Sequence, residues 1–416
     1  MPKLHSLYHP EKMLMHLKKI GALHDHDHDH DRKDYTSYND FKKAVPILTE
    51  SNLSEKVKEL ISNNDLQSCS FSMTSGTTGH PKLLVNSLWR NENKIHYAAY
   101  FKKIMEKHVL SRADVVANLF TAGGFSTLYD GCSRLLEGIG CHLLPIGRLD
   151  SFSLSAQHQM ISKMQQIGLD VLFGTPSSII YLLKLSKSFG INLNIRKIVF
   201  TGEPFSNEKR NFVKAIWPSV NIYGLYGHSE TGFIGINMPQ CENQHYHYFN
   251  DWFFLETINN NELLVTSYAD ILMPIIRYQV GDQVRLFDQI CSCGMDLPIL
   301  ILQGRKDKKF NFSGNLISSD IVKNKLSKLF LENIEFQIQL QSDQKGRDKL
   351  ILILNNSHQC KIKDNELYTA LLEIDEISEA IQKQAGVITI QWNDNFLKSE
   401  RQKQPIIIDY RMREVK

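Results

Sequence analysis

The stretch that decides the fold is residues 72–82, which read Ser-Met-Thr-Ser-Gly-Thr-Thr-Gly-His-Pro-Lys. Gly76 and Gly79 let backbone N–H groups turn toward one anion, and Lys82 adds a cation beside them. The loop also offers hydroxyl donors, from Thr74, Ser75, Thr77 and Thr78. The spacing differs from the Gly-x-x-x-x-Gly-Lys-Ser/Thr pattern of a Walker loop. The composition indicates a loop that binds a polyphosphate, and the alternative is a surface turn rich in Ser, Thr and Gly.

Length and charge limit the class of protein. The chain has 416 residues, enough for two to three domains at about 150 residues each. Its net charge of +3 argues against a dedicated nucleic-acid binder. No apolar run reaches the roughly 18 residues of a membrane helix, and the N-terminus carries charges where a signal peptide is apolar. We therefore expect a cytoplasmic protein without a membrane partner.

Two features of the sequence suggest metal binding. Seven cysteines are an odd count, which fits reduced thiols or a metal site better than a disulfide framework. Residues 24–30 read His-Asp-His-Asp-His-Asp-His, and alternating imidazole and carboxylate groups can chelate a divalent metal. No apolar pattern surrounds this tract to fix its geometry, so a solvated loop is the simpler interpretation.

Strand-like and helical segments alternate from about residue 40 onward. Short runs rich in β-branched and aromatic residues predict strands at 115–120, 171–174, 197–201 and 220–225. Helical periodicity covers residues 155–167 and 177–189. Strand, helix and strand at this pitch predict an α/β protein whose parallel or mixed sheets are covered by helices.

The pattern changes twice further along the chain. After about residue 245 the strand candidates 251–258, 262–267 and 283–287 follow one another without helices. After residue 304, three predicted strands and one helical stretch suggest an α+β module: strands 334–341, 349–354 and 387–392, and helix 364–383. We expect a large domain over residues 1–304, with a β-rich part at about 240–300, and a small domain over residues 305–416.

The loop at residues 72–82 closely resembles the signature loop of the adenylate-forming superfamily. This superfamily contains acyl- and aryl-CoA synthetases, nonribosomal-peptide adenylation domains and luciferases. The resemblance implies a large domain that binds ATP and a small, mobile C-terminal domain. It assigns one set of residues to the nucleotide: Thr74, Ser75, Gly76, Thr77, Thr78, Gly79 and Lys82. Further motifs are then expected in a fixed order.

Three such motifs follow. Residues 202–204, Gly-Glu-Pro, look like the family's adenine-side turn. Residues 226–230, Tyr-Gly-His-Ser-Glu, resemble the motif in which an aromatic ring packs against adenine and a glutamate, here Glu230, holds the magnesium of Mg-ATP. Asp282 matches the aspartate that accepts from both ribose hydroxyls, although Val280 replaces the family's threonine. The nucleotide candidates in these motifs are Gly202, Glu203, Pro204, Tyr226, Gly227, His228, Ser229 and Asp282.

Residues 304–307, Gly-Arg-Lys-Asp, are similar to the family's hinge motif before the small domain. The resemblance implies that Arg305 contacts the nucleotide, that Asp307 is the pivot and that Gly314 faces the channel of the acceptor thiol. Lys308 and Lys309 stand where relatives have an acid and a methionine. This difference makes the acceptor side more basic.

Two short pairs of metal ligands flank a β-like segment. Cys291 and Cys293 form one pair, and Cys241 supplies the other with either His245 or His247. Thiolates and one imidazole suit a closed tetrahedral zinc site, and unrelated buried cysteines are the alternative. The phenylacetate-CoA-ligase-like branch of the superfamily carries such a structural zinc, and its pattern implies His247. Four protein ligands leave no open position, so this zinc would stabilise the fold.

The same branch, with its coenzyme F390 synthetase relatives, is similar to this chain at residues 45–49, 120–124 and 399–411. It implies two half-reactions: a carboxylate attacks the α-phosphate of ATP, and a thiol then attacks the acyl-adenylate and releases AMP. In relatives a C-terminal lysine bridges the carboxylate and the ribose. Lys403 matches that lysine, although Gln402 replaces the expected glycine, and Lys398 is the alternative. The catalytic candidates are Lys403, Glu230 and Thr78.

Candidates for the acid pocket lie at the ends of predicted strands, where ligands of open α/β folds collect. They are Phe120, Gly123, Gly124, Phe125, Gly174 and Pro176. Glycines and phenylalanines suggest a flat, apolar acid such as an aromatic one. We therefore expect an AMP-forming acid–thiol ligase that uses ATP and Mg²⁺, with CoA or the phosphopantetheine of a carrier protein as acceptor and a homodimer as the default assembly. The alternatives are an adenylyltransferase that stops at the nucleotidyl step and a catalytically weakened nucleotide-binding homologue.

Overall fold

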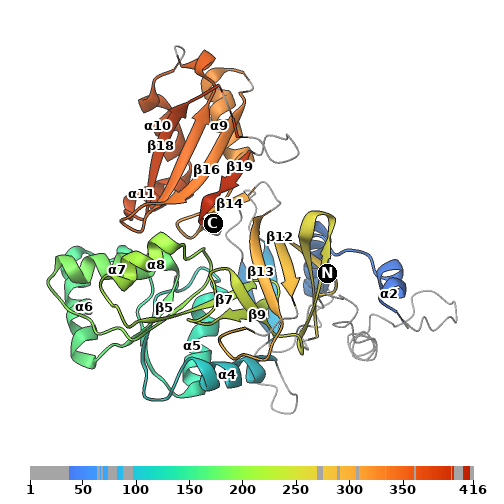
Figure 1. Ribbon diagram of the computed structural model, residues 1–416, viewed down its shortest axis with the longest axis vertical. Helices are drawn as coiled ribbons and strands as arrows, with labels where there is room; N and C mark the ends of the chain where they lie inside the picture. The colour runs from blue at the N-terminus through green and yellow to red at the C-terminus, as the bar shows by residue number, and fades with distance from the viewer. Residues whose placement is uncertain are drawn as a thin grey trace.

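An 11-stranded mixed sheet forms the centre of the larger body of the protein (Figure 1). The computed structural model describes residues 37–62, 66, 69–73, 82–87, 97–268, 275–287, 291–305, 309–332, 334–359, 362–394, 396–397 and 406–412. The strands of this sheet follow the order β10-β11-β12-β13-β9-β8-β7-β6-β5-β3-β4. The fold is mixed α/β, which confirms the predicted fold class.

The parallel half of the sheet contains five strands: β3 (Val115–Asn118), β4 (His142–Pro145), β5 (Val171–Gly174), β6 (Lys197–Phe200) and β7 (Asn221–His228). Alternate residues of each strand enter different cores, since successive side chains point to opposite faces. Val171 and Phe173 pack on one face and Leu172 on the other. One face is covered by α4 (Tyr97–His108) and α5 (Thr127–Ile139), and the other by α6 (Leu154–Ile167), α7 (Pro176–Ser188) and α8 (Asn207–Lys214).

Capping residues explain where these covering helices begin and end. Ser153 and Ser206 accept hydrogen bonds from the first turns of α6 and α8. Thr175 caps α7, and Pro176 occupies its first position, where a missing N–H costs nothing. Gly168 ends α6 in the left-handed conformation.

The antiparallel half continues the same sheet beyond β7. Its strands are β8 (Gly232–Asn237), β9 (His245–Tyr248), β10 (Phe253–Ile258), β11 (Glu262–Ser267), β12 (Tyr278–Phe287) and β13 (Ile299–Arg305). The β-rich region is therefore not a separate sheet, because β8 pairs directly with β7. The helices α2 (Tyr38–Ala44) and α3 (Glu50–Ser62) and the hairpin of β1 (Cys69–Met73) and β2 (Leu83–Ser87) complete this body.

A smaller α+β body follows in the chain and lies beside the larger one (Figure 1). Its sheet has the order β18-β17-β16-β19, built from β16 (Phe336–Ser342), β17 (Asp348–Leu354), β18 (Gly386–Trp392) and β19 (Ile407–Asp409). The helices α9 (Ser319–Phe330), α10 (Asp364–Leu372) and α11 (Asp375–Gln382) share a core with it, as does the hairpin of β14 (Lys309–Phe312) and β15 (Asn315–Ser318). The short η5 (Tyr410–Met412) follows β19.

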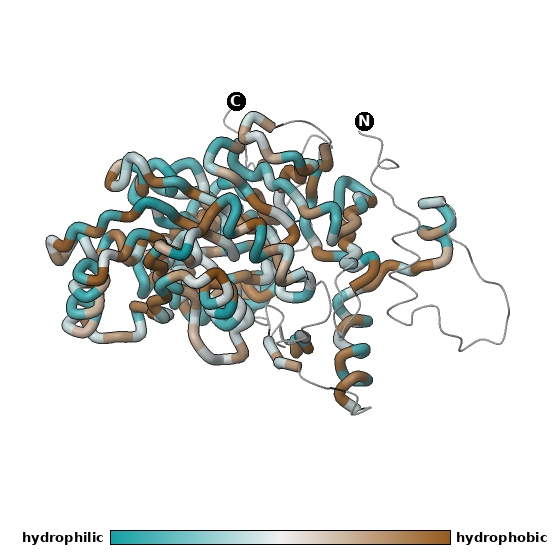
Figure 2. The backbone as a smooth tube through the Cα atoms, turned by 90° about the horizontal axis from the view of Figure 1, so that it is seen from below, coloured by the Kyte–Doolittle hydropathy of each residue, from teal (hydrophilic) through white to brown (hydrophobic). Residues whose placement is uncertain are grey.

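The predicted strands and helices all occur in the structure, and two of them need correction. The strand predicted over residues 283–287 is longer and begins at Tyr278, as β12. The helix predicted over residues 364–383 is two helices, α10 and α11. The break falls at Ile374, which is extended and 3% exposed, because its side chain turns into the core of the smaller body. Among the described residues no helix combines the length and the hydropathy needed to cross a membrane, and polar and apolar residues alternate along the helices in Figure 2.

Candidate active site

A cavity of about 2120 Å³ lies at the carboxyl ends of β6 and β7. It is also lined by α3, α5, β12 and β13 of the larger body and by β14 and β19 of the smaller one. Ligands of open α/β sheets bind at this edge of the strands. The predicted site residues that line the cavity are Lys82, Gly123, Gly124, Gly202, Glu203, Pro204, Tyr226, Gly227, His228, Ser229, Glu230, Asp282 and Arg305.

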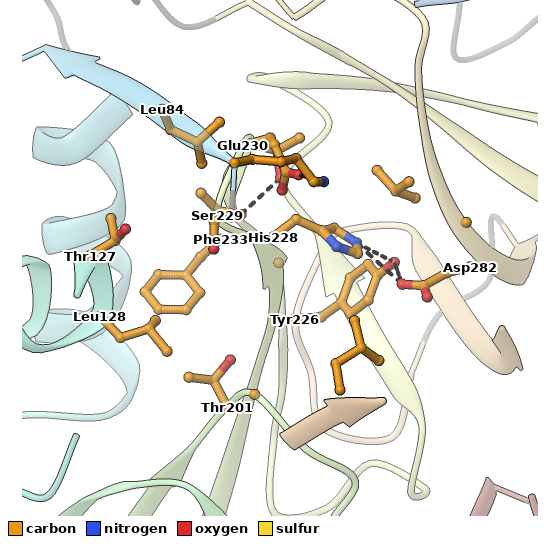
Figure 3. Close-up of a pocket in the computed structure, with 18 of the residues that line it drawn as sticks. Leu84, Thr127, Leu128, Thr201, Tyr226, His228, Ser229, Glu230, Phe233 and Asp282 are labelled. Atoms are coloured by element: carbon orange, nitrogen blue, oxygen red, sulfur yellow. Dashed lines mark hydrogen bonds and ion pairs between the residues drawn. The ribbon is translucent and has the colours of Figure 1, made fainter. Parts of the chain in front are cut away.

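Asp282 lies at the centre of a polar group on one side of the cavity (Figure 3). Its Oδ2 accepts a hydrogen bond from the Tyr226 hydroxyl at 2.7 Å and lies 3.2 Å from Nε2 of His228. The Arg305 guanidinium approaches Oδ1 at 3.3 Å. Burial raises the pKa of Asp282, but Arg305 and His228 lower it by more, so the pKa falls below its ordinary value. The site therefore holds an ionised acceptor of hydrogen bonds beside a buried aromatic ring.

Glu230 forms a second polar group with Lys82. The Lys82 ammonium lies 2.8 Å from Oε1 of Glu230, and the Tyr278 hydroxyl donates to the same oxygen at 3.0 Å. Burial raises the pKa of Glu230, while Lys82 and His228 lower it below the ordinary value. An ionised carboxylate next to a lysine can hold a hard divalent cation once the ammonium turns to a phosphate.

Glu50 was not found from the sequence, yet it connects the two bodies at the cavity. It is the first residue of α3, and its carboxylate lies 3.3 Å from Nζ of Lys82 and 3.4 Å from Nζ of Lys309. Acids are common in the first turn of a helix, so Glu50 carried no signal of a site. Two ammonium groups therefore meet at this point of the cavity wall, and they could pair with a phosphate as they do with the Glu50 carboxylate.

The turn at residues 202–204 places a buried carboxylate on the cavity wall. Gly202 has a φ of 87°, the left-handed region in which a Cβ is unfavourable. Glu203 accepts hydrogen bonds from the backbone N–H and the hydroxyl of Ser177, both at 2.7 Å. These hydrogen bonds connect the turn at residues 202–204 to the first turn of α7.

The residues predicted for the acid pocket are divided by the structure. Gly123 and Gly124 line the cavity, whereas Phe120, Phe125, Gly174 and Pro176 are not among its lining residues. Phe120 is buried in the core, with its ring 5.4 Å from that of Phe173. A Cβ on Gly174 would lie 2.9 Å from Cβ of Leu119, the residue after β3, so this close approach explains the glycine. Phe125 does not pack in the core, because 53% of this residue is exposed to solvent.

Apolar side chains form another part of the cavity wall, and the sequence did not single them out. Leu84, Leu128 and Phe233 come from β2, α5 and β8 and lie on the same side in Figure 3. Further apolar lining residues are Tyr97, Phe101 and Leu135. Their only signal is the apolar pattern of a strand or of a helix face, which cannot distinguish a core from a cavity.

The four predicted zinc ligands meet at one point. The ligand atoms of Cys241, His247, Cys291 and Cys293 all lie within 4.8 Å of one another. Nε2 of His247 is 3.1 Å from Sγ of Cys293, and its Nδ1 faces the Leu297 carbonyl at 2.8 Å. A donated Nδ1–H leaves the Nε2 lone pair for a metal. His245, the alternative, is not part of this group.

Several predicted residues lie outside the described residues. They are the loop residues Thr74, Ser75, Gly76, Thr77, Thr78 and Gly79, the pivot Asp307, the lysines Lys398 and Lys403, and the tract 24–30.

The fold is that of an open α/β protein, and its polar cavity lies where such proteins bind their ligands, at the carboxyl ends of the parallel strands. The family model of AMP-binding enzymes matches residues 12–248, more than half of the chain. The chain therefore belongs to the AMP-binding enzymes, the adenylate-forming superfamily that its motifs resemble. It is an AMP-forming acid ligase, and this part of the predicted function is confirmed.

Individual relatives agree with this family. The chain is 27% identical to the indoleacetate–lysine synthetase of Pseudomonas savastanoi over 379 residues, which is 90% of this chain and 92% of the relative. It is 28% identical to the phenylacetate–coenzyme A ligase of Pseudomonas putida over 235 residues, 51% of this chain and 49% of the relative. The structure of 2-hydroxyisobutyryl-CoA ligase with 2-HIB-AMP and CoA matches with a TM-score of 0.65 and 16% identity over 98% of this chain and 91% of that chain. This last match shows the fold.

Proposed function

We propose that this protein uses ATP to activate an aromatic carboxylic acid as an acyl-adenylate and then transfers the acyl group to an acceptor nucleophile. One observation supports the proposal above all. Charged side chains from segments far apart in the chain line one cavity, among them Lys82, Glu230 and Asp282. Their signs suit Mg-ATP, with a cation for phosphates, an acid for magnesium and an acid for hydroxyl groups.

The nucleotide-binding roles are part of this proposal. Asp282 accepts from the ribose hydroxyls, Tyr226 contributes the ring beside adenine, and Arg305 neutralises charge near them. Lys82 and the loop at residues 74–79 bind the phosphates, and Glu230 holds Mg²⁺ when Lys82 turns away. Positioning and charge neutralisation are what a protein supplies to such nucleotidyl transfers.

The smaller body contributes the catalytic lysine in this proposal. Lys403, or Lys398, bridges the acid carboxylate and the ribose, and Thr78 assists at the phosphates. The small domain of this proposal extends to residue 416 and starts after Arg305, which ends β13 of the larger sheet, with Asp307 as its pivot. Ile407 and Asp409, which follow Lys403 in the chain, line the cavity.

The acid is proposed to be an arylacetic acid. The wall formed by Leu84, Leu128 and Phe233 offers apolar surface for a ring beside the polar groups. The two curated relatives are named for indoleacetate and phenylacetate, and both of these acids carry an aromatic ring.

For the acceptor, we favour an amine of an amino acid. The acyl-adenylate carbonyl is attacked by the amine, the C–O bond to the phosphate breaks, and AMP and a proton leave. The match to the indoleacetate–lysine synthetase covers 92% of that relative, whose name describes ligation to lysine. The thiol of CoA or of a carrier protein is the second candidate, because the other relative is named as a CoA ligase.

We also propose that Cys241, His247, Cys291 and Cys293 hold a structural zinc ion. Three thiolates and one imidazole are a donor set that zinc prefers, and their ligand atoms lie within 4.8 Å of one another. The ion would connect β9 to the segment that precedes β13.

Exchange of radiolabelled pyrophosphate into ATP tests the first half-reaction. A panel of aryl, arylacetic and aliphatic acids is expected to give exchange with arylacetic acids. Addition of lysine or of CoA then identifies the acceptor by mass spectrometry of the product. Exchange with no acid would overturn the proposal. A stable adenylylated product with either acceptor present would instead favour an adenylyltransferase.

A further inference from the structure

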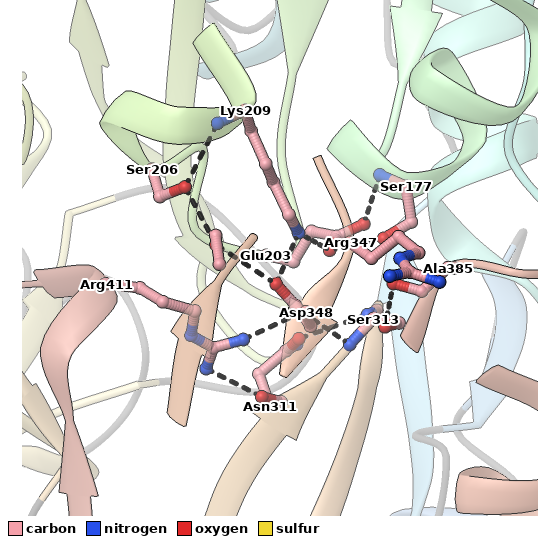
Figure 4. Close-up of polar contacts among 12 residues, drawn as sticks. Ser177, Glu203, Ser206, Lys209, Asn311, Ser313, Arg347, Asp348, Ala385 and Arg411 are labelled. Carbon is pink, nitrogen blue, oxygen red and sulfur yellow. Dashed lines mark hydrogen bonds and ion pairs between the residues drawn. The ribbon is translucent and has the colours of Figure 1, made fainter. Parts of the chain in front are cut away.

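Lys209 joins the two bodies of the protein without lining the cavity (Figure 4). It lies on α8, and its side chain is 0% exposed. Its Nζ is 3.1 Å from Oε2 of Glu203, in the larger body, and 2.8 Å from Oδ1 of Asp348, at the start of β17 in the smaller body. A single buried ammonium therefore bridges the two bodies.

The contacts continue from Asp348 to the end of the described chain. Arg411 lies 2.8 Å from Oδ2 of Asp348 and 2.6 Å from Oδ2 of Asp409. Its Nη2 also donates to the Asn311 carbonyl at 2.7 Å. Glu203 and Asp409 both line the cavity, one from each body. The buried groups between them thus connect two carboxylates on different parts of the cavity wall.

The charges in this network depend on one another. Burial by itself lowers the pKa of Lys209, but Asp348 and Glu203 raise it above the ordinary value. Burial raises the pKa of Asp348, and Lys209 and Arg411 lower it. A buried charge without its partner is strongly unfavourable, so these contacts favour one arrangement of the two bodies relative to each other. In this arrangement Gly314 lies against Glu203, and a Cβ on Gly314 would be 3.5 Å from Oε1 of Glu203.

The two bodies contribute different parts of the cavity wall. The nucleotide candidates Tyr226, Asp282 and Arg305 belong to the larger body. The smaller body contributes, among others, Lys309, Asn311, Gly314 and Asp409. In the proposed function the described nucleotide-binding residues belong to the larger body and the smaller body adds a catalytic lysine; the rest of the smaller body's wall is the side on which we place the acceptor.

We infer that Lys209 is a positioning residue for acyl transfer: it holds Glu203 and, through Asp348 and Arg411, Asp409 where the acceptor enters. This inference rests on the proposed function. It predicts that loss of the Lys209 charge disturbs transfer more than adenylation.

The test compares Lys209→Met with Lys184→Met. Lys184 is a matched control, because its Nζ donates to the Gln384 carbonyl of the smaller body at 3.4 Å and lies outside the network. We expect Lys209→Met to lower kcat/KM for the acceptor at least tenfold, while pyrophosphate exchange changes less than threefold. Lys184→Met should change neither rate by more than about twofold. Equal loss of exchange and transfer, or no loss of transfer, would overturn the inference.

A second variant separates positioning from stability. Lys209→Met leaves Asp348 and Glu203 facing each other, which can prevent folding. The double variant Lys209→Met/Asp348→Asn removes that repulsion and leaves Arg411 paired with Asp409. It should fold, as circular dichroism will check, and still lose transfer selectively. Transfer at the parent rate in the folded double variant would contradict the inference, whereas a parent that shows no exchange with any acid would overturn the proposed function itself.

Discussion

The hydroxyl of Tyr226 donates a hydrogen bond to the Asp282 carboxylate at 2.7 Å, although the two residues are 56 positions apart. The bond joins β7, at the junction of the two halves of the sheet, to β12 in the antiparallel half. Two motifs that are separate in the chain therefore form one group on the cavity wall.

Asp282→Asn is expected to raise KM for ATP by about tenfold to a hundredfold, because hydrogen bonds to a charged group contribute about 1.5–3 kcal/mol. Pyrophosphate exchange at varied ATP measures the change. Tyr226→Phe, which keeps the ring and removes the hydroxyl, is the control and should raise KM less. If Asp282→Asn exchanges with the parent's KM, Asp282 does not bind the ribose.

Glu230→Gln is expected to lower exchange by about 10²-fold or more and to raise the Mg²⁺ concentration needed for half-maximal rate, because the amide cannot neutralise a divalent cation. A magnesium titration of the exchange rate makes the measurement. Glu208→Gln, an exposed acid on α8, serves as the control. An unchanged magnesium dependence would remove Glu230 from this role.

Cys293→Ser is expected to abolish zinc binding and to lower Tm by at least about 5 °C, since the metal connects two segments of the antiparallel half. Metal analysis of the parent should find about one zinc per chain. Cys141→Ser, at a cysteine outside the cluster, should keep the zinc. A parent free of zinc, with the melting curve of the variant, would contradict the proposed metal site.

Gly227→Ala is expected to destabilise the fold by about 1–3 kcal/mol or more, because overpacking strains the backbone. An added Cβ would lie 2.2 Å from the Gly232 carbonyl oxygen across the β7–β8 pair. Urea unfolding measures the loss. Gly138→Ala in α5 is the matched control: its nearest neighbour would be Lys102 at 3.7 Å, and alanine should stabilise the helix by about 0.5–1 kcal/mol. Equal stability of the two variants would refute the steric argument.

The free energy of unfolding is expected to decrease as the pH of the solution falls below about 5. The pKa values of Asp282 and Asp348 are lower in the folded chain than their ordinary value of 3.8. Such groups stabilise the fold above their unfolded pKa, and this contribution is lost as pH falls through the folded pKa. Urea unfolding at pH 5, 4 and 3 measures the slope, and Asp348→Asn should make it shallower. A stability that rises on acidification in this range would show the opposite sign.

The fold and much of the candidate site were predictable because their signals are local. Strands such as β5 follow from a short apolar run, and the helices α6 and α7 from their 3.6-residue period. The ligands Cys241, His247, Cys291 and Cys293 were named from spacing and resemblance, and their side chains meet in the structure. The acid pocket was less predictable, since Phe120 packs in the core while Leu128 and Phe233 line the cavity. Apolar residues have the same pattern in both environments.

The sequence by itself determined the order of the elements, the family and the residue types that suit Mg-ATP, because a hydrophobic period and a motif are properties of neighbouring residues. Only the tertiary structure decided that one sheet contains both the parallel and the β-rich regions, that Glu50 meets Lys82 and Lys309, and that Lys209 joins Glu203 to Asp348. These contacts cross between distant segments. They depend on how the bodies pack and which charges are buried together, and no local pattern in the chain records that packing.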